Sequence, residues 1–331
     1  SSHVGSSHLG SFSREPHVPL RPTARWFGGM GQTCSRKCCC QDDRDKIAKP
    51  IPDDAGFRSL QQDVARKDFE DHAVDSTNGE LSYFERELPE LRVLQSSKSG
   101  GEKEKRPPFK FKSGAVYTGQ WKGNMRHGFG VQTWADGACY KGEWRENCAK
   151  GKGSFSHSDG DIYIGEWRDN VANGNGIYYH RDDNTYLGEW VNDLQEGHGV
   201  ETWPQGTRYE GHFRTGQKEG HGVYFWADQS QYCGAWEVNT FNGKGAFIGS
   251  DGRWFKGTWQ DSVINGVGKY MWPDGREYYG QYVFDRKEGF GIFVWPDGRK
   301  YEGYWSQGRQ HGSGITTEKD GSSRVQEWVN C

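Results

Sequence analysis

A short frame, Tyr-x-Gly-x-Trp, returns every 23 residues through the C-terminal part of this chain. Its first copy holds Tyr117, Gly119 and Trp121, and a degenerate tenth copy ends at Trp328. A second frame, Gly-x-Gly, follows with the same interval in nine copies. Two frames that stay in phase over so many copies do not arise by chance, so residues 114–331 are predicted to form a repeat array with nine good units and a degenerate tenth.

Each unit has the periodicity of β-strands, because residues at i, i+2 and i+4 share one face of a strand. The Tyr, Gly and Trp of the frame therefore point to the same side. An Asp-Gly pair such as Asp136-Gly137 recurs at the same interval and is a strong hairpin signal, since Gly adopts positive φ easily. We therefore predict an all-β fold, an elongated, twisted antiparallel β-hairpin repeat array of 23-residue units.

The composition indicates what packs this array. The chain has 48 Gly with 15 Trp, 16 Tyr and 17 Phe, while hydrophobic residues of all kinds make up only 33%. A ring that lies over a bare strand glycine can replace an aliphatic core. The repeat-face aromatics expected to do so are Tyr117, Trp121, Tyr140, Trp144, Tyr163, Trp167, Tyr186, Trp190, Tyr209, Tyr232, Trp236, Trp259, Tyr278, Tyr301 and Trp305.

The combination of Tyr-x-Gly-x-Trp, Gly-x-Gly and an Asp-Gly turn resembles the MORN repeat (membrane occupation and recognition nexus). The resemblance implies the elongated β array described above. It also implies scaffolding, because MORN arrays occur in cytoskeletal and ciliary scaffolds, in junction proteins that tie membranes together, and beside lipid-kinase or methyltransferase domains. Self-association through terminal repeats and phosphoinositide binding are further expectations that the resemblance raises.

Residues 30–41 carry an acylation pattern. Met30-Gly31-Gln32-Thr33-Cys34-Ser35 matches the motif in which Met is removed and the new terminal Gly is myristoylated. One myristoyl chain binds membranes only marginally, and palmitoylated cysteines nearby would supply the second anchor. The predicted lipidation sites are Gly31, Cys34, Cys38, Cys39 and Cys40.

This motif needs a terminal glycine, so we expect Met30 to be the start and residues 1–29 to be a leader or a gene-model extension. The alternative is a fragment of a longer protein in which the cysteines are ordinary thiols. Residues 42–113 are predicted to be a spacer with short helices, in an N-terminal region that is largely disordered. An apolar stripe at helical spacing within the spacer is predicted to dock onto the array: Leu81, Phe84, Leu88, Leu91 and Leu94.

Catalysis and cofactor chemistry are not expected. His198 and His221 lie one unit apart, about 10 Å, which is too far for ligands of one zinc ion. The Gly-x-Gly frames lack the third glycine and the helix start of a dinucleotide-binding loop. A net charge of −3 does not favour nucleic acid. We expect no enzyme activity, no cofactor, no metal site and no nucleic-acid partner.

The predicted function is therefore a non-catalytic, membrane-anchored scaffold. It would tether cytoskeletal or cortical protein partners to the cytoplasmic face of the plasma membrane or of a cortical membrane system. The exposed last strand is an unpaired edge that would allow homo-oligomers to form through the terminal repeats. Two alternatives stay open: a regulatory MORN segment of a larger membrane enzyme such as a phosphoinositide kinase, and a scaffold component of a cilium or axoneme.

Overall fold

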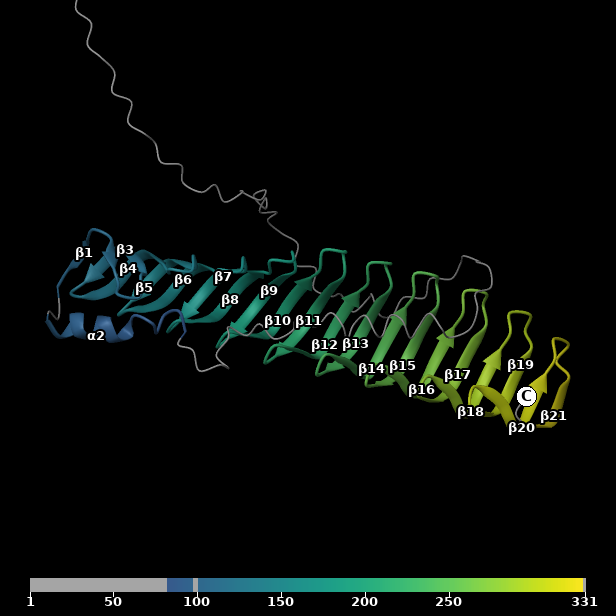
Figure 1. Ribbon diagram of the computed structural model, residues 1–331. Helices are drawn as coiled ribbons and strands as arrows, with labels where there is room; N and C mark the ends of the chain where they lie inside the picture. The colour runs from purple at the N-terminus through teal and green to yellow at the C-terminus, as the bar shows by residue number, and fades with distance from the viewer. Residues whose placement is uncertain (1–81, 98–100, 330–331) are drawn as a thin grey trace, which may run out of the picture. The chain divides into compact units, whose positions relative to one another are not determined.

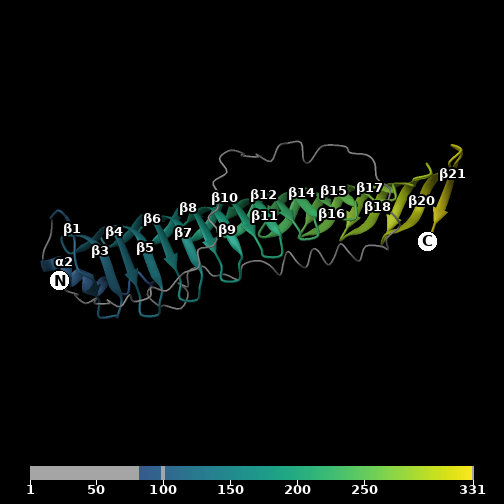
Figure 2. The same cartoon turned by 90° about the horizontal axis from the view of Figure 1, so that it is seen from above.

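The computed structural model describes residues 82–97 and 101–329. The predicted acylation motif, residues 1–29, most of the spacer and Leu81 lie outside the described residues. The described part contains one antiparallel sheet of 21 strands and the helix α2 (Leu88–Ser97). Figures 1 and 2 show the strands following one another along an elongated, twisted sheet. The all-β hairpin-repeat prediction is confirmed.

Two kinds of strand alternate along the sheet, and each strand pairs with its neighbours in the sequence. The first kind carries the Tyr-x-Gly-x-Trp frame: β3 (Val116–Lys122), β5 (Cys139–Arg145), β7 (Ile162–Arg168), β9 (Thr185–Val191), β11 (Arg208–Arg214), β13 (Gln231–Glu237), β15 (Trp254–Gln260), β17 (Glu277–Val283), β19 (Lys300–Ser306) and β21 (Ser323–Trp328). The second kind carries Gly-x-Gly: β4 (Met125–Thr133), β6 (Cys148–Ser156), β8 (Val171–Tyr179), β10 (Leu194–Thr202), β12 (Gln217–Phe225), β14 (Thr240–Ile248), β16 (Val263–Met271), β18 (Arg286–Val294) and β20 (Arg309–Thr317).

An interrupted strand covers the N-terminal edge of the sheet. β1 (Lys103–Lys105) and β2 (Phe109–Lys110) both pair with β3, with Lys105 opposite Gln120 and Phe109 opposite Tyr117. Pro107 and Pro108 lie between them, and proline has no N–H to give to a ladder. The sheet thus begins upstream of residue 114, within the predicted spacer.

The Asp-Gly pairs form three-residue loops between the two kinds of strand. In the first loop the Gly137 N–H donates to the Trp134 carbonyl, and the Trp134 N–H donates to the Ala138 carbonyl. Asp136 Oδ1 accepts a hydrogen bond from the Ala138 N–H. Only Gly137 has positive φ, 95°. This is a type I turn followed by a glycine in the left-handed region, and not the two-residue turn that Asp-Gly alone would make.

The two-residue turns lie elsewhere and were missed by the sequence analysis. Glu146 and Asn147 have φ of 53° and 73° between β5 and β6, as a type I′ turn requires. In every unit the second turn residue is Asn, Asp, Ser or Gly, which is the signal that could have located these turns. Asn147 Oδ1 also accepts a hydrogen bond from the Arg126 N–H, at 2.7 Å, so the turn side chain joins two units. In other units the equivalent hydrogen bond from a backbone N–H is accepted by the side-chain oxygen of Asn170, Asp193, Asn239, Ser262 or Asp285.

The core is a ladder of rings on glycines, as predicted. A Cβ on Gly130 would lie 2.4 Å from the Tyr117 hydroxyl oxygen, so only glycine fits under this ring. The Tyr117 ring packs edge-on against Trp121 of its own unit and Trp144 of the next, with centroids 5.1 and 5.5 Å away. The Trp144 indole N–H donates to the Gly130 carbonyl at 3.2 Å. All fifteen predicted repeat-face aromatics are buried, none more than 8% exposed.

Candidate functional site

One side of the sheet carries these rings, and we call it the aromatic face. The Gly-x-Gly strands also contribute to it, because Arg126 stands opposite Trp121 and Gln132 opposite Tyr117. These two positions vary between units while the rings do not. The residues equivalent to Arg126 are Ala149, Ala172, Gln195, Lys218, Phe241, Ile264, Lys287 and Gln310. On the aromatic face, the units therefore differ from one another in the side chains that these two positions add between the rings.

Residues 82–94, here called the docking segment, pack onto the aromatic face of the first units. Phe84 is buried among five rings, with centroids 5.4 to 5.9 Å away: Trp134, Tyr140, Trp144, Phe155 and Trp167. Leu91 is also buried. The predicted docking of the apolar stripe is confirmed for Phe84 and Leu91. Pro89 does not break the helix, because it lies in the first turn of α2, where no N–H bond is needed.

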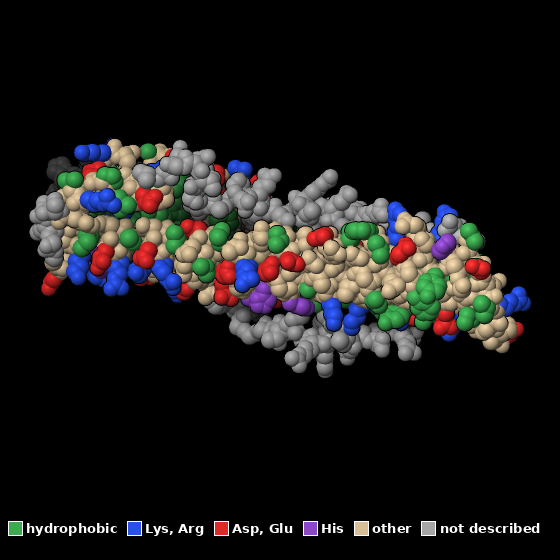
Figure 3. Space-filling view, turned by 90° about the horizontal axis from the view of Figure 1, so that it is seen from below, with side chains coloured by type: hydrophobic (Ala, Val, Ile, Leu, Met, Phe, Trp, Pro, Cys, Tyr) green, Lys and Arg blue, Asp and Glu red, His purple; other side chains and the backbone are tan. Residues whose placement is uncertain are grey.

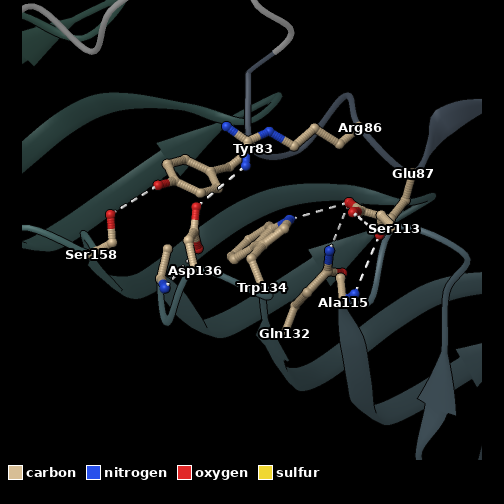
Figure 4. A network of polar contacts seen from close by, with 10 residues as sticks. Tyr83, Arg86, Glu87, Ser113, Ala115, Gln132, Trp134, Asp136 and Ser158 are labelled. Atoms are coloured by element: carbon tan, nitrogen blue, oxygen red, sulfur yellow. Dashed lines mark hydrogen bonds and ion pairs between the residues drawn. The ribbon is translucent and has the colours of Figure 1, made fainter.

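Glu87 anchors the docking segment through buried polar contacts (Figure 4). Its side chain is 1% exposed. One carboxylate oxygen accepts hydrogen bonds from the Gln132 amide, at 2.9 Å, and the Trp134 indole, at 3.3 Å. The other accepts a hydrogen bond from the Ser113 hydroxyl at 2.9 Å. Each donor is satisfied by the carboxylate, so removing it would leave buried polar groups without partners.

The guanidinium of Arg126 is a buried cation next to the polar contacts of Glu87. The Arg126 guanidinium donates to the Gln132 side-chain oxygen and lies 4.1 Å from the Trp144 ring centroid. Burial lowers the pKa of Arg126 to about 10, against the attraction of Glu87, which raises it. The Gln132 amide therefore links a buried carboxylate to a buried guanidinium.

These contacts fix the docking segment to one position along a periodic surface. The residues equivalent to Gln132 in the next units are Phe155, Tyr178 and Glu201, and those equivalent to Arg126 are Ala149, Ala172 and Gln195. A segment moved along by one unit would place Glu87 beside Phe155 and Ala149 instead of the amide and the guanidinium, which is costly for a carboxylate. The first unit alone offers both the amide and the guanidinium.

Weaker contacts surround these anchors. Arg86 lies 3.4 Å from Asp136 and over the Tyr83 ring, at 4.2 Å, and such exposed pairs contribute little to stability. α2 also contacts the first hairpin: the Lys112 N–H donates to Glu90 at 2.8 Å, and the Asn124 amide donates to the Leu94 carbonyl at 2.6 Å. Phe84 and Glu87 are the main determinants of docking.

Beyond Phe84 the aromatic face holds a hollow of about 230 Å³, here called the Ala172 hollow. Residues 82–85 form one side of it. Two features of the sequence open it. Ala172 stands where all units except the preceding one, which has Ala149, have longer side chains. His157 and His180 stand where Trp134, Trp203 and Trp226 lie in other units. The turn residues Asp169 and Asp193 lie at its rim.

Asp193, which lines the hollow, is a carboxylate with a displaced pKa. Its Oδ1 accepts a hydrogen bond from the Ala172 N–H at 2.6 Å. Burial nevertheless raises the pKa of Asp193 to about 6, because the hydrogen bond only partly offsets the loss of water. A cation placed beside it would favour the charged carboxylate.

The opposite side of the sheet is more exposed. Figure 3 shows charged side chains of both signs over the N-terminal units and hydrophobic side chains gathered toward the C-terminal end. Exposed apolar residues there include Val267, Tyr279, Phe290 and Tyr304, and the last two rings lie 5.8 Å apart.

Within residues 82–97 and 101–329, no group of three or more His, Cys, Asp and Glu side chains is arranged to hold a metal ion. Cys139, Cys148 and Cys233 form no disulfide bonds. Among the helices that the structure describes, none has the length and hydropathy needed to cross a membrane.

Sequence reasoning found the rings but not the residues that distinguish one unit from another. Arg126, Gln132 and the two histidines occupy positions that follow the same 23-residue interval as the rings. The usable signal is therefore variation at a constant position of the repeat. Glu87 lacked even this signal, because its partners come from distant parts of the sequence.

Comparison with known proteins supports the assignment of the fold. The description "MORN repeat" belongs to the family model that matches residues 117–139, 140–162, 163–185, 186–208, 209–231, 255–275, 278–298 and 301–323. No curated protein matches the sequence. The family model does not match the unit at residues 232–254, although β13 and β14 form this unit in the structure.

Several solved structures show a distant likeness. A mutant of the TCP10 domain of Danio rerio CPAP is 14% identical over 60% of this chain and 92% of that chain, with a TM-score of 0.35. The G-box domain of the microcephaly protein CPAP is 14% identical over 61% of this chain and 100% of that chain, also with a TM-score of 0.35. The TCP domain of Drosophila melanogaster SAS-4, in complex with a proline-rich motif of Ana2, is 11% identical over 54% and 85%, with a TM-score of 0.27.

These structural likenesses are too distant to transfer a function. The family model is different in kind, because its matches cover more than half of the chain and coincide with the hairpins of the sheet. Each matched range begins at the Tyr or Phe whose ring lies over a pair of glycines. The chain belongs to the MORN-repeat family.

Proposed function

We propose that this protein is a non-catalytic scaffold whose aromatic face binds segments of partner proteins. A role in protein interaction is supported by the MORN array itself. The observation that carries the proposal is Phe84, which is buried among five rings of the array although it lies outside the repeats. The aromatic face therefore accepts a peptide segment in the way that a binding groove would.

Photo-cross-linking at two positions of one strand tests this proposal. A photoreactive residue at Gln310 reports on the aromatic face, and one at Ser313 reports on the opposite side of β20. In cells that make the full chain, we expect adducts with other proteins from Gln310 and only background from Ser313. Equal labelling at both positions, or none at Gln310, would contradict binding by the aromatic face.

We further propose that acylation at Gly31, with palmitoylation of the neighbouring cysteines, holds the scaffold at the cytoplasmic face of a membrane. The support is the sequence pattern, since these residues lie outside the described part. The test is metabolic labelling with an alkyne myristate analogue of a chain that starts at Met30, followed by membrane fractionation.

Gly31→Ala should abolish both label and membrane retention, while Gly56→Ala, the same change outside the motif, should keep both. A protein that takes up no label, or one that stays on membranes as Gly31→Ala, would exclude this anchor. Neither result would affect the proposal that the aromatic face binds protein segments.

A further inference from the structure

The Ala172 hollow repeats the surroundings of Phe84 one unit further along. Each of the five residues whose rings pack against Phe84 has an equivalent 23 residues later. All five equivalents line the hollow: His157, Tyr163, Trp167, Tyr178 and Trp190. The hollow thus has the lining of a site that demonstrably accepts a phenylalanine side chain.

A large side chain is sterically compatible with this position of the repeat. Ala149 in the unit that takes Phe84 is equivalent to Ala172 in the next. Three units beyond Ala172, Phe241 occupies the equivalent position, is 1% exposed and stacks on Tyr232 with centroids 3.9 Å apart. A ring can therefore lie on this part of the aromatic face, either from the docking segment where the strand has an alanine or from the strand itself in place of the alanine.

The rim of the hollow differs from that of the Phe84 site in charge. Asn170 Oδ1 accepts the Ala149 N–H at 2.7 Å, and Asp193 Oδ1 makes the equivalent bond to Ala172. A carboxylate therefore replaces an amide, and the exposed Asp169 lies on the same rim. Opposite charge in a ligand is favoured beside a partly desolvated carboxylate.

We propose that the Ala172 hollow binds one bulky apolar side chain, Phe, Leu or Met, of a partner protein segment that carries Lys or Arg beside it. The inference rests on the proposed function and adds to it the chemistry of the partner and its place on the array. The docking segment forms one wall of the hollow, so the partner segment lies next to Phe84 rather than in its place.

The probe is a phage library of random twelve-residue peptides, panned on the full chain. We expect enriched peptides to combine a bulky apolar residue with a neighbouring Lys or Arg. Ala172→Phe fills the hollow as Phe241 does in its own unit, and it should weaken these peptides at least about tenfold. Ser313→Phe, which adds the same side chain on the opposite side of the sheet, should leave their affinity unchanged.

The charge is tested separately with Asp193→Asn. This change gives the position the same residue type as the equivalent Asn170 and keeps an oxygen that can accept the hydrogen bond from the Ala172 N–H. We expect basic peptides to bind about three- to tenfold more weakly, with a reduced dependence on salt. Asp285→Asn is the matched control, because Asp285 makes the equivalent bond to the Ile264 N–H at 2.7 Å. It should have no effect on binding.

Three results would overturn the inference. The first is that no peptide, or no peptide of this composition, is enriched. The second is that the enriched peptides bind Ala172→Phe as tightly as the parent protein. If Gln310 still forms adducts in that case, the aromatic face binds partner segments but the Ala172 hollow is not the site. The third comes from a photoreactive residue placed at Leu194, which lines the hollow. If it cross-links only to residues 1–81 of the same chain, the occupant of the hollow is this chain and not a partner protein.

Discussion

The Glu87 carboxylate accepts a hydrogen bond from the Gln132 side-chain amide at 2.9 Å, and neither side chain is more than 1% exposed. The two residues are 45 positions apart, one in the docking segment and one in β4. Their bond decides where along the periodic aromatic face the docking segment lies, because no other unit has a glutamine there. It is also the contact whose loss should be easiest to detect.

Glu87→Ala should release the docking segment. The change leaves the buried Gln132 and Trp134 donors without a partner, which costs about 1–3 kcal/mol. Hydrogen exchange measured by mass spectrometry should show faster exchange in residues 82–94 and no change in β17–β20. Glu85→Ala is the matched control, since Glu85 is exposed and its side chain bonds only to Ser82 of the same segment among the contacts described. Unchanged protection in Glu87→Ala would show that Phe84 alone holds the segment.

Gly176→Ala should disrupt the ladder locally. A Cβ there would lie 2.4 Å from the Tyr163 hydroxyl oxygen and 2.5 Å from its ring. Tyr163 is held by the rings of Trp167 and Trp190, with centroids 5.2 and 5.3 Å away, and by the hydrogen bond from its hydroxyl to the Glu166 carbonyl. We therefore expect a loss of about 2–4 kcal/mol, seen as a lower midpoint of thermal unfolding. Gly206→Ala separates sterics from backbone strain, because its φ is 88° and nothing lies within 4 Å. That control should lose only about 1–2 kcal/mol, and equal losses would refute the steric argument.

Val238→Asn should stabilise the array. Val238 is 55% exposed and holds φ at 47° in a type I′ turn, a conformation that β-branched residues adopt only with strain. Asn tolerates this region, so the variant should gain about 0.5–1 kcal/mol, measured by urea unfolding. Val191→Asn makes the same change at an exposed residue in an ordinary strand and should give no gain. A gain in both variants would point to solubility and away from backbone strain.

Asp193→Asn should change how stability depends on pH. Burial raises the pKa of Asp193 to about 6 from an ordinary value near 4, so the folded protein binds more protons than the unfolded chain between pH 4 and 6. Its free energy of unfolding therefore falls as the pH rises through this window. The variant cannot ionise, and it should be more stable than the parent by about 2–3 kcal/mol at pH 7 and equally stable below pH 4.

Thermal unfolding followed by Trp fluorescence at several pH values measures this difference. The control is Asp169→Asn, the neighbouring carboxylate on the same rim, whose exposed pair with Lys150 spans 3.3 Å and contributes at most about 1 kcal/mol. A stabilisation by Asp193→Asn that is the same at pH 4 and pH 7 would show that the gain does not come from ionisation.

The fold was predictable because its determinants are periodic. A period of 2 within Tyr117-x-Gly119-x-Trp121 indicates a strand, and the 23-residue interval then specifies every neighbour. The turn chemistry was only half predictable. Asp136-Gly137 is a recognised signal, whereas Glu146-Asn147 shows its regularity only when the second residues of all units are aligned.

The candidate site was less predictable because it depends on departures from the period. His157 in place of tryptophan and Ala172 in place of a long side chain open a hollow, yet each is an unremarkable residue in its own sequence context. The partner of Glu87 could not be inferred either, since helical spacing indicates that a segment docks but not in which register. Only three-dimensional contacts decide that Gln132 and not its equivalents receives the carboxylate.

The contact of each repeat tyrosine with aromatic rings of two successive units also sets distances. Because Tyr117 touches both Trp121 and Trp144, neighbouring units are locked together by their cores and not merely by their chain connections. Two ligands held n units apart are then separated by about 10 Å times n, the width of two strands per unit. A flexible linker of the same number of residues would let that separation fluctuate widely. The array is thus suited to act as a molecular spacer that keeps bound segments at set intervals.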